Sequence, residues 1–65
     1  MEQQQLFDEW ERRLAANGKT LLDLRIKSGV HAPNFSNWRN GKTGITLASI
    51  QRLEAAVRAL ESAAA

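Results

Sequence analysis

The chain has 65 residues, enough for one domain and too few for two. It contains no cysteine and a single histidine, which excludes disulfides and thiolate metal sites, and we expect neither a metal nor another cofactor. The longest apolar runs are far too short to span a membrane, and no leader of the signal-peptide type precedes the first amphipathic segment. We therefore expect a cytoplasmic protein of a bacterial or phage-infected host cell.

Charge is distributed unevenly along the chain. Residues 1–18 carry four acids and two bases, whereas residues 19–44 carry five bases and one acid, although the whole chain has a formal net charge of only +2. A basic segment of this kind favours a partner with a phosphate backbone.

Apolar residues at helical spacing predict a first amphipathic helix at about residues 3–16, ended by Asn17 and Gly18. Thr20, three residues before Asp23, predicts the N-cap of a second helix at residues 21–28. The apolar residues of these two helices that we expect to pack against neighbours are Leu6, Phe7, Trp10, Leu14, Leu21, Leu22, Leu24 and Ile26.

Gly29 interrupts the second helix, and Val30 after it is expected in the core. A third helix is predicted at residues 32–40, with Pro33 in its first turn, where the missing N–H has no helical partner to lose. Phe35 and Trp38 mark its buried side, and Asn40 with Gly41 supplies its end.

A fourth helix is predicted at residues 47–61, where Thr46 is the N-cap and Ile45 and Ile50 have the spacing of a hydrophobic staple. Its expected apolar stripe consists of Leu47, Ile50, Leu53, Val57 and Leu60. No alternating run of strand length occurs. The sequence thus predicts an all-α fold: a single domain over residues 1–65, a compact bundle of four helices, or five, that contains a helix-turn-helix.

Two short helices joined through Gly29 are the arrangement that places a helix in the major groove of DNA. Such a helix needs buried anchors, which Phe35 and Trp38 offer, and outward amides, which Asn34 and Asn37 offer. The aromatic residues could instead stack on bases, but in so small a domain they are more readily explained as core. The two asparagines could be idle surface amides; we favour base contact because asparagine is a poor interior helix residue.

Residues 29–41, GVHAPNFSNWRNG, and residues 46–57, TLASIQRLEAAV, resemble the Cro/lambda-repressor-like (XRE-type) helix-turn-helix family over about residues 17–57. The Ser-x-Trp-Arg-x-Gly segment is similar to that of small phage-encoded regulators. Three positions depart from the family pattern: Leu21 stands where glutamine is usual, Arg25 where a small residue is usual, and His31 where a Ser or Thr cap is usual.

The resemblance implies a sequence-specific regulator of transcription, a phage or prophage repressor (or activator) of the Cro type that binds a double-stranded DNA operator as a homodimer. The expected base-contacting residues are Ala32, Pro33, Asn34 and Asn37. The expected phosphate-contacting residues are Lys19, Thr20, His31, Ser36, Arg39, Asn40, Lys42 and Thr43. A small-residue contact through Ala56 and Leu60 is the expected dimer interface.

One alternative keeps the fold but changes the partner: a protein-interaction module such as an antitoxin, a polymerase-binding factor or a phage inhibitor. The polar and basic surface of residues 31–43 argues against it. An enzyme is not expected, because no catalytic triad, phosphate-binding glycine loop or carboxylate pair can be assembled from these residues.

Overall fold

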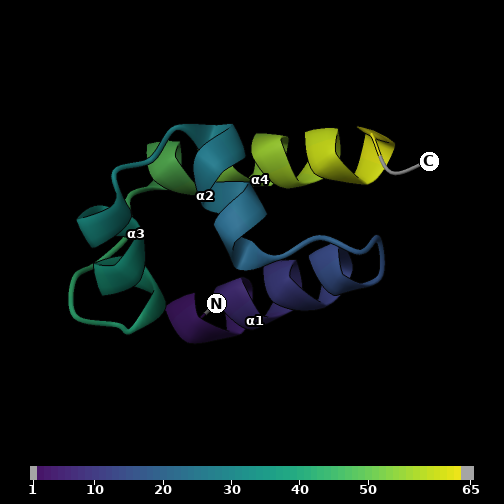
Figure 1. The fold of residues 1–65 in the computed structure, drawn as a ribbon. Coiled ribbons are helices and arrows are strands. Elements are labelled where there is room, and N and C mark those ends of the chain that lie inside the picture. The colour runs from purple at the N-terminus through teal and green to yellow at the C-terminus, as the bar shows by residue number, and fades with distance from the viewer. Residues whose placement is uncertain (1, 64–65) are drawn as a thin grey trace.

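The computed structural model describes residues 2–63, which form four helices and no strand (Figure 1). These are α1 (Gln3–Ala15), α2 (Leu21–Ser28), α3 (Ala32–Arg39) and α4 (Leu47–Ala63). The all-α prediction is confirmed, and each helix begins where the sequence predicts. The ends of the predicted domain, Met1, Ala64 and Ala65, lie outside the described residues.

The helix ends follow local signals in the sequence. Gly18 adopts φ +71° after α1, and Thr20 and Asp23 form a capping box at the start of α2. Thr46 accepts a hydrogen bond from the backbone N–H of Ser49 (3.2 Å) and caps α4 as predicted. In contrast, His31 precedes α3 without a side-chain cap. Since a cap satisfies an otherwise unpaired helical N–H, these signals fix where α2 and α4 begin.

Helices α1 and α4 pack side by side and run in the same direction (Figure 1). At one end the side chain of Gln3 accepts a hydrogen bond from the backbone N–H of Ile45 (2.9 Å), and at the other Arg13 forms an ion pair with Glu61 (2.7 Å). Between these ends Trp10 is fully buried and donates its indole N–H to Glu54 (3.1 Å). Phe7, Trp10 and Phe35 therefore belong to the core as predicted, whereas Trp38 is only partly buried and packs against it.

Three large apolar residues lie outside the core, contrary to expectation. Leu22 and Ile26 of α2 are 59% and 63% exposed, and Leu47 of α4 is 69% exposed. Helix α2 packs through the face that carries Leu21 and Leu24, and Leu22 and Ile26 lie on another face of the helix, which points away from the core. Leu47 occupies the first turn of α4, ahead of the stripe that reaches the core at Leu53 and Val57.

Of the helices that residues 2–63 form, none has both the length and the apolar content needed to cross a bilayer.

Candidate nucleic-acid interface

The turn between α2 and α3 is fixed by its own residues and by a side chain of α4. Gly29 ends α2 with φ +73°, in the left-handed region that favours glycine, and buried Val30 follows it. The hydroxyl of Ser28 accepts a hydrogen bond from the N–H of Val30 (3.4 Å), and Arg52 of α4 donates to the carbonyl of Ser28 (2.8 Å). Helix α4 therefore supports the turn that sets the angle between α2 and α3, a contact that the sequence did not predict.

Helix α3 lies at one end of the molecule (Figure 1), and it buries Phe35 while residues 32–34 are exposed. Phe35 is buried edge-on against Phe7, with ring centroids 5.4 Å apart, and Trp38 packs against the core with part of its ring exposed. Two aromatic residues therefore anchor α3 to the core: Phe35, which is buried, and Trp38, which is partly buried.

The outer face of α3 carries the residues that the sequence assigned to base contact. Ala32, Pro33 and Asn34 are exposed and Asn37 is partly exposed. Among residues 2–63, neither of these asparagine side chains has a hydrogen-bond partner, in contrast to Asn40, which donates to Ser36 (3.4 Å). Two unpaired amides one turn apart on α3 are therefore available to hydrogen-bond donors and acceptors of an external ligand.

The end of α3 brings together most of the predicted phosphate contacts. The backbone N–H of Gly41 (φ +73°) donates to the carbonyl of Trp38, and the backbone N–H of Lys42 donates to the backbone carbonyl of Asn37 (2.9 Å). These two bonds are the hydrogen-bond pattern of a Schellman motif. This motif places the exposed residues Ser36, Arg39, Asn40, Lys42 and Thr43 on the last turn of α3 and the loop after it. We call these five residues the exit cluster.

The other three predicted phosphate contacts lie elsewhere. His31 is exposed at the start of α3, and Lys19 and Thr20 precede α2, at the end of that helix remote from the Gly29 turn. The Thr20 hydroxyl is already engaged, since it accepts from the N–H of Asp23 (3.2 Å) and donates to the Asp23 carboxylate (3.1 Å). Hydrogen bonds from the backbone and then the side chain of Thr20 lower the pKa of Asp23, which keeps a negative charge beside this helix terminus. The Asp23 carboxylate would repel a phosphate at this position. The role of Thr20 that the structure shows is therefore that of a helix cap.

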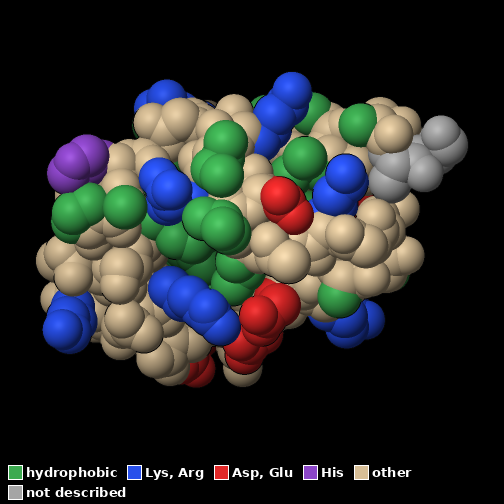
Figure 2. Space-filling view, in the orientation of Figure 1, with side chains coloured by type: hydrophobic (Ala, Val, Ile, Leu, Met, Phe, Trp, Pro, Cys, Tyr) green, Lys and Arg blue, Asp and Glu red, His purple; other side chains and the backbone are tan. Residues whose placement is uncertain are grey.

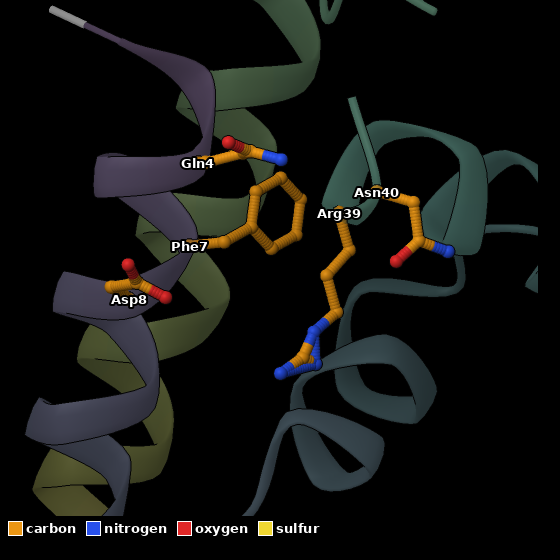
Figure 3. A pocket seen from close by; sticks show the side chains of 5 residues that line it. All are labelled: Gln4, Phe7, Asp8, Arg39 and Asn40. Atoms are coloured by element: carbon orange, nitrogen blue, oxygen red, sulfur yellow. The ribbon is translucent and has the colours of Figure 1, made fainter. Parts of the chain in front are cut away.

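Arg39 extends into the space between α1 and the end of α3, beside Asn40 (Figure 3). An open hollow of about 510 Å³ is lined by these two residues and by Gln4, Phe7 and Asp8 of α1. The Arg39 guanidinium lies 3.5 Å from the Glu11 carboxylate. This member of the exit cluster therefore has an acidic partner within the protein, which the sequence did not predict.

The surface over α2 is unlike the outer face of α3. Figure 2 shows hydrophobic side chains gathered there, with Lys and Arg side chains on several sides of them. Leu22 and Ile26, which lie one turn apart, are the large exposed apolar residues of this helix.

The predicted dimer contact on α4 is mostly covered by the chain itself. Ala56 is 7% exposed and packs in the core, so of the predicted pair only Leu60, which is partly buried, retains surface for a second chain.

Comparison of the chain with protein-family models, with curated proteins and with solved structures finds no match. The functional interpretation of the outer face of α3 and the exit cluster therefore depends on their geometry and chemistry.

Proposed function

We propose that this chain is a sequence-specific regulator that binds double-stranded DNA, a phage or prophage repressor of the Cro type with α3 in the major groove. The observation that carries the proposal is the outer face of α3. Asn34 and Asn37 are free of intramolecular hydrogen bonds to the described residues, whereas Phe35 of the same helix is buried against the core. A helix anchored on one side and bearing free amides on the other has the features of a reading helix.

Base readout follows from the chemistry of that face. The amide of asparagine is able to donate to and accept from the major-groove edge of adenine, and the apolar surfaces of Ala32 and Pro33 suit the methyl group of thymine. We therefore expect A·T pairs in the half-site. The exit cluster supplies phosphate contacts from the other end of the helix, and these position the protein without reading sequence.

Fluorescence anisotropy against a duplex selected from a random pool, and against its scrambled sequence, tests the proposal. We expect the selected duplex to bind about 10³-fold more tightly than the scrambled one at the same salt concentration. Lys42→Ala should reduce the slope of log affinity against log salt by about 0.9, because one phosphate contact is lost. Lys27→Ala is the matched control, since it removes the same charge from α2, outside the exit cluster. Equal affinity for every duplex contradicts the proposal.

A second candidate function is favoured by one observation, the exposed pair Leu22 and Ile26. A protein-interaction module on this fold would use that apolar surface, since exposed apolar patches commonly mark protein contacts. The anisotropy measurement separates the two: a module that binds only protein prefers no duplex and shows no effect of Lys42→Ala beyond that of Lys27→Ala.

A further inference from the structure

The side chain of Gln3, in the first turn of α1, joins three backbone groups that lie 35 to 42 residues further along the chain. Its Nε2 donates to the carbonyl of Trp38 (2.6 Å) and to the carbonyl of Thr43 (2.8 Å), and its Oε1 accepts from the N–H of Ile45 (2.9 Å). These groups belong to the last turn of α3 and to the loop that leads into α4.

The chemistry of this contact requires an amide. A glutamine side chain has two N–H donors and one carbonyl oxygen, and both the nitrogen and the oxygen are used here. A carboxylate in the same place would have no proton to give to the two carbonyls, and an alanine would reach none of the three groups. The neighbouring Gln4 lies close to the same loop, since a Cβ added to Gly41 would lie 3.4 Å from its side-chain nitrogen.

The contact holds the loop that carries Lys42 and Thr43 against the beginning of α1. We propose that Gln3 is a positioning residue of the DNA interface, which fixes the loop after α3 in the conformation that places the exit cluster on the phosphate backbone without itself touching DNA. This inference rests on the proposed DNA-binding function.

Loss of the contact should lower affinity by a particular route. Without Gln3 the loop samples other conformations, and apparent affinity falls in proportion to the fraction of molecules that remain competent to bind. If the loop is competent about one tenth of the time, the apparent Kd rises about tenfold. The bound complex keeps the same phosphate contacts, so the salt slope should stay at its wild-type value, unlike that of Lys42→Ala.

Gln3→Ala and Gln3→Glu test the inference, with Gln5→Glu as the matched control. Gln5 lies exposed on the same helix, so Gln5→Glu adds the same charge to α1 without touching the loop. Binding is measured at a temperature at which circular dichroism shows every variant to be folded, so that a general loss of stability does not affect the measured affinity. Amide hydrogen exchange at Ile45, followed by NMR, reports on the loop in the absence of DNA.

We expect both Gln3 variants to bind the selected duplex about tenfold more weakly at an unchanged salt slope, with faster exchange at Ile45, and Gln5→Glu to resemble the wild type. Wild-type affinity in both Gln3 variants overturns the inference, as does unchanged exchange at Ile45 or a salt slope that falls with the affinity. A wild-type chain that prefers no duplex contradicts the proposed function instead. The exchange measurement then still decides whether Gln3 holds the loop, and the role of Gln3 at DNA fails with the function.

Discussion

Arg39 shows how a single residue of the exit cluster is shared between the protein and its proposed ligand. Its guanidinium lies 3.5 Å from Glu11, and both side chains are exposed. Contact with a phosphate would require Arg39 to leave this carboxylate or to tolerate it beside the DNA. If the chain binds DNA as proposed, we therefore expect the ion pair to compete with that binding.

Glu11→Gln should raise affinity for the selected duplex by about 1.4- to fivefold, because an exposed ion pair is worth about 0.2–1 kcal/mol and its loss frees Arg39. Glu9→Gln is the control: it removes the same charge from α1, but Glu9 pairs with Arg12. Anisotropy at one salt concentration measures both variants. Equal gains in the two would indicate a general effect of net charge, and no gain from Glu11→Gln would show that the ion pair does not compete.

At the scale of elements, α1 and α4 are joined by a partly exposed polar network. The Glu54 carboxylate accepts hydrogen bonds from Arg13, Trp10 and Arg58, and Glu61 accepts from Arg13. The hydrogen bond from Arg13 is the largest cause that lowers the pKa of Glu54 to about 2, and it lowers the pKa of Glu61 as well. The same two carboxylates raise the pKa of Arg13, so the charged forms stabilise one another.

This network predicts a loss of stability in acid. A carboxyl group whose pKa is lower in the folded state stabilises the fold above its unfolded pKa, and that stability is lost as pH falls through the folded pKa. For Glu54 the window runs from its ordinary value of 4.5 down to about 2. Urea unfolding at pH 6 and at pH 3 gives the loss of unfolding free energy between these two pH values. We expect this loss to be smaller in Glu54→Gln than in the wild type by about 1–2 kcal/mol, a value reduced by solvent screening of the pair. An unchanged difference would contradict this role for the network.

At the scale of the whole molecule, we expect a homodimer on DNA, with half-sites about 34 Å apart so that two copies of α3 enter successive major grooves. Sedimentation with a duplex carrying two half-sites measures this directly. Two protomers should bind together when the sites are one helical turn apart and independently when the spacing is changed by half a turn. Strictly independent binding at both spacings would contradict the homodimer.

The parts of the fold that the sequence predicted are those with a local cause. Thr20 with Asp23, Gly29, Pro33 and Thr46 each act within a few residues, so the beginnings of α2, α3 and α4 and the end of α2 followed from them. The exposure of Leu22 could not be predicted, because α2 is a two-turn helix with apolar residues on both faces. Which face is buried depends on how the other helices pack against it.

The candidate site divides in the same way. That Asn34 and Asn37 face outward could be predicted from their spacing relative to Phe35. The contacts of Gln3 with the loop and of Arg52 with the turn could not, since each joins residues at least 24 positions apart and neither side chain stands in a recognisable motif. Long-range hydrogen bonds of this kind depend on the packed helices rather than on neighbouring residues.

The proposed function depends above all on base contact by the Asn34 and Asn37 amides on the outer face of α3. Selection from a pool of random duplexes, carried out with the wild type and with the Asn34→Ala, Asn37→Ala double variant, tests it most directly. We expect the wild type to select a defined half-site containing A·T pairs, and the double variant to lose this preference while still binding DNA through the exit cluster. An identical selected sequence for the two proteins would contradict it.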